Sequence, residues 1–98
     1  MVAPKPNETR LAGTVREIRP IGGQPALRDL VVAVERAEAV EGLADLLSST
    51  PGQDLPVTID AEDLADLGLQ PGERVVLGAE LRGPGAVWSR PQTVRRDA

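Results

Sequence analysis

The chain has 98 residues, enough for one small domain. It lacks cysteine and histidine, which excludes disulfides, thiolate metal sites and histidine-based acid–base chemistry or metal binding. Leu, Val and Ile make up 26 residues, above the roughly 20% below which a charged chain tends to stay disordered, and Trp88 is the only aromatic residue. No apolar run is long enough to span a membrane and no secretory leader opens the chain, so we expect a cytoplasmic protein.

Charge is segregated along the chain. Residues 1–34 carry a net charge of +2, residues 35–66 carry −8 and residues 67–98 carry +2, giving −4 in total. A uniformly acidic protein repels nucleic acid, but a segregated one can still present a local basic surface. The alternative is that these charges only solvate exposed faces.

The first third of the chain predicts an arm and two strands. Residues 1–9 hold two prolines without apolar periodicity, which indicates a flexible N-terminal arm. Residues 10–18 alternate with period two until Ile18 breaks the phase, which predicts a strand with a bulge or bend. A Pro- and Gly-containing loop over 20–25 follows. Residues 27–40 form a second strand with apolar residues on both faces.

The rest of the chain predicts two helices and three more strands. Leucines at helical spacing predict a short helix over 41–49, and LPVTI predicts a third strand over 55–59 with Pro56 at its start or on an edge. Residues 60–67 predict a helix capped by Asp60 and closed by Gly68 in a left-handed conformation. After a tight turn over 70–73, strands are predicted over 74–82 and 86–90. Residues 95–98 are a basic tail, which we expect to fray.

Five strands with a helix between the third and the fourth match the OB-fold, a partly open Greek-key β-barrel. We therefore predict an all-β protein with a single OB-fold-like domain over residues 10–94. The absence of βαβ spacing excludes a doubly wound parallel sheet. A small barrel of SH3-like topology is the second possibility, which the helix before the fourth strand disfavours.

Two stretches resemble a known family. Val57–Ile59, Asp60–Leu67, the turn Gly68-Leu69-Gln70-Pro71-Gly72-Glu73 and Val75–Leu81 look like the second half of a TOBE domain, and Arg10–Val15 is similar to its opening strand. Together they cover about half the chain. TOBE domains are OB-fold variants found in molybdate-binding proteins and in transport ATPases, so the resemblance implies small-oxyanion binding.

Catalysis has no candidate site in this sequence. A nucleophilic serine needs a base, and the only lysine, Lys5, lies in the predicted arm. Glu62, Asp63 and Asp66 are the densest carboxylates, but we expect them on the solvated face of a short helix. The glycine-rich turns fit no phosphate-loop motif, and no calcium-loop spacing exists. We therefore predict a protein that is not an enzyme and has no metal site or cofactor.

A binding function fits the predicted fold better. In OB-folds the loops between strands 1 and 2 and between strands 4 and 5 flank the ligand face, and here they are residues 20–26 and 83–85. The candidate nucleic-acid-binding residues beside these loops are Arg19, Arg28, Arg82, Trp88 and Arg90. Arginines around a stacking ring are typical of weak single-stranded nucleic-acid binding. In the alternative interpretation Trp88 packs in the core, because tryptophan is highly buried on average, and the arginine side chains pair with nearby acidic residues.

A protein-interaction or oligomerisation module is the other class of function. The second strand places Val31 and Ala33 opposite its other apolar residues, so these two are candidates for burial against a protein partner or a second copy of the chain.

Overall fold

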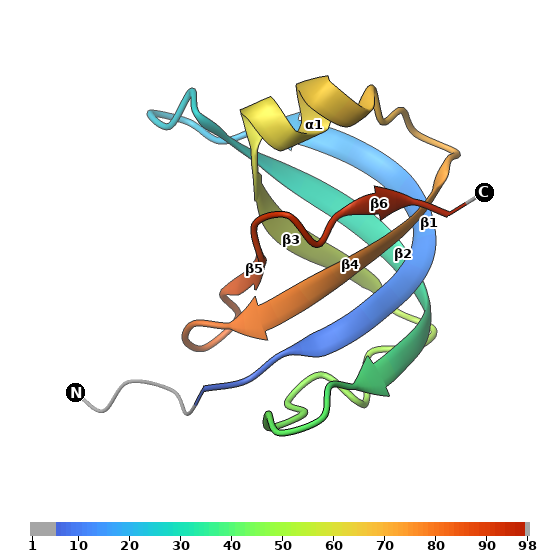
Figure 1. The fold of residues 1–98 in the computed structure, drawn as a ribbon. Helices are drawn as coiled ribbons and strands as arrows, with labels where there is room; N and C mark the ends of the chain where they lie inside the picture. The colour runs from blue at the N-terminus through green and yellow to red at the C-terminus, as the bar shows by residue number, and fades with distance from the viewer. Residues whose placement is uncertain (1–5, 98) are drawn as a thin grey trace.

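A computed structural model describes residues 6–97 of the chain as a small barrel of antiparallel and parallel strands with one short helix (Figure 1). The elements are, in chain order, β1 (Thr9–Pro20), β2 (Leu27–Ala39), β3 (Asp54–Asp60), α1 (Ala61–Leu67), β4 (Arg74–Leu81), β5 (Val87–Ser89) and β6 (Arg95–Arg96). This confirms the predicted β-barrel and the position of its helix between the third and fourth strands.

The barrel closes because β1 pairs on both of its edges. β1 runs antiparallel to β2 along one edge and to β4 along the other. β2 pairs with β3, β3 makes a single parallel contact with β5, and β5 returns antiparallel to β4. The two-residue β6 adds to β4 beyond β5. This closed five-stranded arrangement is compatible with an OB-like fold.

The core is filled by aliphatic side chains that alternate along each strand, as period-two patterning requires of a small barrel. Val75, Leu77 and Ala79 of β4 point inward, and Leu30 and Val32 of β2 do the same. Each is at most 1% exposed. The residues between them in each strand point the other way and therefore form the outer surface.

Two register shifts curve the β1–β2 pair around the barrel. One lies between Ala12 and Gly13, where Glu35 of β2 is left without a partner in β1, and the other between Val15 and Glu17, where Arg16 is left without a partner in β2. The bulge predicted from the phase break at Ile18 therefore occurs two residues earlier. Extra residues of this kind increase strand twist, which helps a single strand to pair on both edges of a closed barrel.

Helix α1 lies across one end of the barrel, the upper end in Figure 1. Leu64 is buried against the core, and Gly68 ends the helix with a φ of 61°, as predicted. Asp60 occupies the N-cap position but its side chain accepts no capping hydrogen bond. Arg96 donates to the carbonyl oxygens of Leu67 (2.8 Å) and Gly68 (3.2 Å), so a residue of β6 stabilises the C-terminal end of the helix.

The helix predicted over residues 41–49 is wrong. This segment consists of turns and bends around Gly42, whose φ is +82°. Its leucines do not share one buried face, since Leu47 is buried whereas Leu46 is 44% exposed. The carboxylate of Asp45 accepts hydrogen bonds from the Thr9 hydroxyl (2.6 Å) and the Leu47 amide (3.3 Å), so local polar contacts replace a helical ladder.

Both ends of the described chain are joined to the barrel. Residues 1–5 of the predicted arm and Ala98 lie outside the described residues. Asn7 is 4% exposed and Thr9 begins β1, so residues 7–9 pack against the barrel and are not a loose arm. Val94 is buried and β6 pairs with β4, so residues 94–96 are an ordered part of the sheet and not a frayed tail.

Candidate functional site

Strand register places five outward-facing residues in one row across the barrel. Arg19 pairs with Asp29, Asp29 with Thr58, Thr58 with Trp88 and Trp88 with Glu80. Directly paired residues project to the same face of a sheet, so this row runs over the outer surface from the loop after β1 to β4. The two loops predicted to flank an OB-fold ligand face lie at its two ends.

Trp88 is half-buried and belongs to this outer row. The residues on either side of it in β5, Val87 and Ser89, are the buried ones. The placement of Trp88 in the core is therefore wrong, whereas the other part of that alternative, arginines paired with nearby acidic residues, is confirmed for Arg19, Arg82 and Arg90. The guanidinium of Arg82 lies over its ring, 4.3 Å from the ring centroid, a cation–π contact that holds the indole in place.

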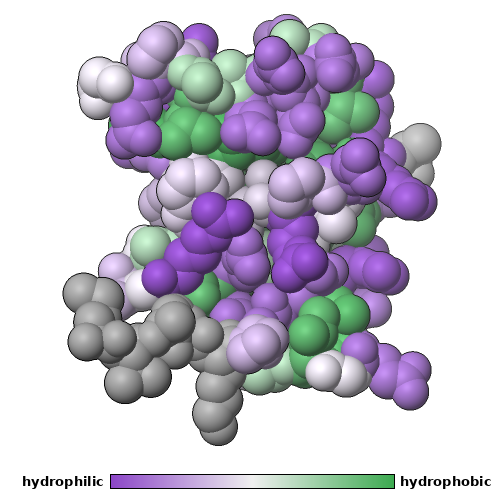
Figure 2. All heavy atoms as spheres, turned by 60° about the vertical axis from the view of Figure 1, so that its left-hand side comes forward, coloured by the Kyte–Doolittle hydropathy of each residue, from purple (hydrophilic) through white to green (hydrophobic). Residues whose placement is uncertain are grey.

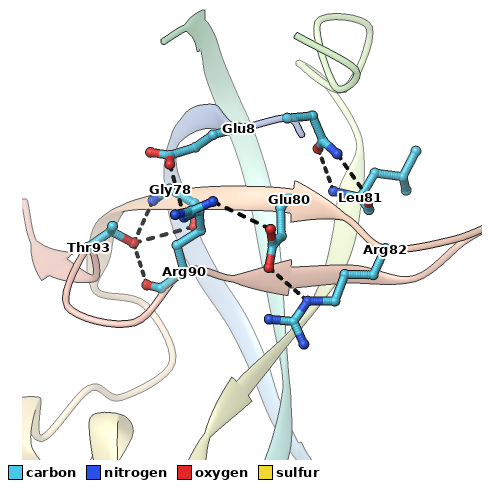
Figure 3. A network of polar contacts seen from close by, with 8 residues as sticks. Glu8, Gly78, Glu80, Leu81, Arg82, Arg90 and Thr93 are labelled. Atoms are coloured by element: carbon cyan, nitrogen blue, oxygen red, sulfur yellow. Dashed lines mark hydrogen bonds and ion pairs between the residues drawn. The ribbon is translucent and has the colours of Figure 1, made fainter. Parts of the chain in front are cut away.

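Arg82 and Arg90 share the carboxylate of Glu80 (Figure 3), and Glu80 is the register partner of Trp88. Glu80 accepts from Arg82 Nε at 2.7 Å and lies 3.5 Å from Arg90 Nη1. Arg90 Nε also lies 3.1 Å from Glu8 Oε1. The result is an alternating chain of charges, Arg82–Glu80–Arg90–Glu8, along the outer face of β4.

Asn7 and Thr93 fix the two segments that carry this network. The side chain of Asn7 donates to the Leu81 carbonyl (3.0 Å) and accepts from the Leu81 amide (2.7 Å), which ties the segment before β1 to the end of β4. The hydroxyl of Thr93 accepts from the Gly78 amide (3.0 Å) and donates to the Arg90 carbonyl (2.6 Å). The segment after β5 is thereby held against the middle of β4.

The other two predicted arginines are placed differently. Arg19 lies at the far end of the outer row, where its guanidinium pairs with Glu17 at 3.1 Å. Arg28 precedes Asp29 and so leaves β2 on the opposite face. Its guanidinium donates to the carbonyl oxygens of Pro25 and Leu27, both at 2.7 Å, within its own loop. The structure thus gathers Arg82, Trp88 and Arg90, leaves Arg19 at a distance and separates Arg28 from the site.

The candidate interaction residues lie on the outer face of β2. Val31 pairs with Glu17 and Pro56, and it is only 5% exposed. Ala33 is half-buried beside Asp54. Val31 is therefore already covered within the chain and offers little apolar surface for a partner to bury. Pro56 lies on the stretch of β3 that has no pairing with β5, as predicted for an edge position.

Sequence reasoning missed a pocket next to the network. It has a volume of about 210 Å³ and lies on the outer face of β4, lined among others by Glu8, Arg10, Gly78 and Arg95. Arg10 and Arg95 are 85 positions apart and belong to segments interpreted as strand surface and frayed tail. Only the pairing of β4 with both β1 and β6 brings them together. The alternation in β1 was the one signal that put Arg10 on the outer face.

Figure 2 shows the side of the barrel that lies on the left in Figure 1, where β5 is located. Hydrophilic side chains cover the middle of this face, and separate hydrophobic areas lie near its upper and lower ends. Within residues 6–97 no three acidic side chains converge in a way that could hold a metal ion. In the same part of the chain, no helix combines the length and apolar character needed to cross a bilayer.

No protein-family model, no curated protein and no solved structure matches this chain. The similarity to TOBE domains therefore gains no support from relatives, and any function has to be argued from the residues themselves.

Proposed function

We propose that the protein is a non-catalytic binding module that takes up single-stranded nucleic acid on its outer face around Trp88. The observation that carries the proposal is the position of this ring. The chain's single tryptophan lies outside the core, beside β3, with the Arg82 guanidinium on its ring. A partly exposed ring flanked by guanidiniums is the arrangement on which a base stacks in sequence-tolerant binding.

The local charge supports the same proposal. The network and the pocket lining, together with Glu38 opposite Arg10 on β2, carry four arginines against three carboxylates, whereas the whole chain has a net charge of −4. The four are Arg10, Arg82, Arg90 and Arg95, and the three are Glu8, Glu38 and Glu80. The excess of one positive charge is small, so we expect weak binding with an affinity in the non-specific range, roughly 10⁻⁴ to 10⁻⁶ M.

The test is a titration with octathymidylate at about 50 and 200 mM salt, following the fluorescence of Trp88. Stacking is expected to quench the emission. Two or three phosphate contacts would weaken binding about tenfold between the two salt concentrations, from a slope of roughly −0.7 per contact for single strands. Absence of quenching and of any change in anisotropy of a labelled strand at low salt would overturn the proposal.

Substitutions at Trp88 separate stacking from charge. Trp88→Phe keeps a ring, and we expect it to bind within about threefold of the wild type. Trp88→Leu keeps apolar bulk but no π-face, and should bind roughly 5- to 150-fold more weakly, corresponding to about 1–3 kcal/mol for one stacked base. Both are measured with a labelled strand after thermal melting has verified folding. Equal affinity for Trp88→Leu and wild type contradicts the stacking role.

The two other functions have less support. Among the described residues Leu46 is the only exposed large hydrophobic, and Pro56 lacks the N–H that strand addition at β3 would use. A protein-interaction module would thus rest on polar contacts alone. A TOBE-like oxyanion site would rest on a resemblance that no relative supports. Analytical ultracentrifugation tests the first, because a monomer at high concentration contradicts self-association.

A further inference from the structure

A small pocket lies on the outer face of β4, at the end of the charge network away from Trp88. Its floor is Val76 and Gly78, which have the same parity in the strand. Arg10 of β1 is the register partner of Gly78, and Arg95 of β6 is the register partner of Val76. Two guanidinium groups therefore reach the same pocket from strands on opposite edges of β4.

These two arginines differ from the others in the molecule. Seven of the ten arginines form ion pairs with carboxylates, and Arg28 donates to carbonyl oxygens of its own loop. Among the arginines of residues 6–97, only Arg10 and Arg95 have a guanidinium group with neither an ion pair nor a hydrogen bond. In a chain with more acidic than basic groups, both unpaired guanidiniums line one pocket.

The only carboxylate in the pocket wall is ion-paired through one of its oxygens. Glu8 Oε1 lies 3.1 Å from Arg90 Nε (Figure 3), whereas Glu8 Oε2 lies against Gly78 at the pocket floor, so the two unpaired guanidiniums share the pocket with one partly compensated carboxylate. The wall is also tightly built, because a Cβ on Gly78 would lie 2.7 Å from Glu8 Oε2 and 3.2 Å from Thr93 Oγ1. Gln92, the one non-glycine residue with positive φ (66°) in the described chain, adds a polar side chain to the lining.

We infer that this Arg10–Arg95 pocket binds a phosphate group. Guanidinium groups recognise phosphate through paired, charge-assisted hydrogen bonds, and two of them facing one space match a tetrahedral anion with several acceptor oxygens. The volume of about 210 Å³ is below the roughly 300 Å³ at which pockets for drug-sized ligands begin, so it suits a small anion and not a whole cofactor.

The phosphate has two possible sources, free phosphate or the backbone of a bound strand. Gly78 lies two residues along β4 from Glu80, the register partner of Trp88. Standard strand geometry then separates the pocket floor from Trp88 by about 8 Å, roughly 7 Å along the strand and about 4.8 Å across it. A strand stacked on Trp88 would pass this pocket. That extension, unlike the pocket itself, rests on the proposed function.

The first experiment titrates the protein with inorganic phosphate at constant ionic strength and follows backbone amides by ¹H–¹⁵N NMR. Saturating shifts are expected at Gly78 and Thr93, with millimolar affinity. Arg10→Gln/Arg95→Gln should weaken binding at least tenfold. Arg16→Gln/Arg28→Gln changes the net charge equally at arginines away from the pocket, because Arg16 pairs with Asp54 and Arg28 donates within its own loop, and should leave binding unchanged. Shifts that do not saturate, or that are lost equally in both double variants, overturn the inference.

The second experiment distinguishes the sources. Octathymidylate is compared with its methylphosphonate analogue, which has the same bases and an uncharged backbone. If the pocket binds the backbone of the strand, octathymidylate shifts the amides of Gly78 and Thr93 and the methylphosphonate analogue does not. The Arg10→Gln/Arg95→Gln variant then also binds octathymidylate more weakly than the wild type. Phosphate binding without any effect of this variant on octathymidylate supports the pocket as a site for free phosphate. If octathymidylate quenches Trp88 but neither phosphate nor octathymidylate shifts the amides of Gly78 and Thr93, the phosphate pocket is refuted and the proposed stacking on Trp88 is retained.

Discussion

Gly13 is the position where the barrel is expected to be least tolerant of a single added methyl group. It lies in β1 beside a register shift, paired with β2 on one side and β4 on the other. A Cβ at Gly13 would lie 2.1 Å from the carbonyl oxygen of Ala33 and 2.9 Å from Val32 Cγ1, whereas ordinary contacts begin near 3.4 Å. The near atom belongs to the backbone, so no side-chain rotation relieves the overlap.

The cost of Gly13→Ala follows from the displacement it forces. β1 and β2 must separate by more than 1 Å at this point. The N···O distances of the nearby ladder hydrogen bonds, about 2.9 Å, would then become too long for hydrogen bonding. Overpacking costs about 1–3 kcal/mol, and one or two weakened hydrogen bonds add about 1 kcal/mol each. The total of about 2–5 kcal/mol corresponds to a fall in Tm of roughly 8–40 °C for a domain of this size.

The assay is thermal and urea unfolding followed by circular dichroism. Gly22→Ala is the matched control, since a Cβ there meets nothing within 4 Å and the backbone does not have positive φ. We expect that control to be neutral or stabilised by up to about 1 kcal/mol. A Tm for Gly13→Ala within a few degrees of the control would refute the reasoning that β1 and β2 are in rigid contact at this point.

Two further substitutions test the network and its anchor. Glu80→Gln removes the carboxylate shared by Arg82 and Arg90, and should tighten octathymidylate binding about 3- to 10-fold at low salt with a steeper salt dependence. The control Glu62→Gln on α1 should change the affinity little. Weaker binding by Glu80→Gln contradicts the placement of these arginines against a bound strand. Asn7→Ala removes two hydrogen bonds to the Leu81 backbone from a side chain of a residue that is 4% exposed, and should lower the free energy of unfolding in urea by about 1–3 kcal/mol. Gln24→Ala at an exposed position is the control. A loss under about 0.5 kcal/mol contradicts the anchoring role of Asn7.

Strands β1 to β5 and helix α1 were predictable because their signals are local, whereas β6 depends on its pairing with β4 and was missed. Alternation in β4 fixes which side chains fill the barrel, and Gly68 follows the last helical turn where a left-handed residue is needed. The segment 41–49 shows the limit of such signals. Its leucines have helical spacing, but Asp45 bonds to Thr9, a residue 36 positions away, and the periodicity contains no trace of that contact.

The candidate site was harder to predict than the fold because it depends on parity and on distant pairings. Arg19 and Arg28 look equivalent beside the same loop, but register puts Arg19 on the outer face and Arg28 on the other. The Arg90 guanidinium finds Glu8, 82 positions earlier in the chain. One additional or missing bulge in β1 would exchange the inner and outer residues that follow it. The residues on the outer face therefore cannot be predicted from composition without knowing the strand register.

Barrel closure explains how an acidic chain acquires a basic face. The charge segments of the sequence run +2, −8 and +2, and the first and last are as far apart in sequence as they can be. β1 belongs to the first segment and β4, β5 and β6 to the last, and the β1–β4 pairing that closes the barrel sets them side by side. Arg10 thereby meets Arg95 across β4, and Arg90 meets Glu8, while α1 carries its carboxylates to the barrel end. Electrostatic attraction for an anion would then act over a short range at this face, within about one Debye length, and would be opposed at longer range by the net charge of the protein.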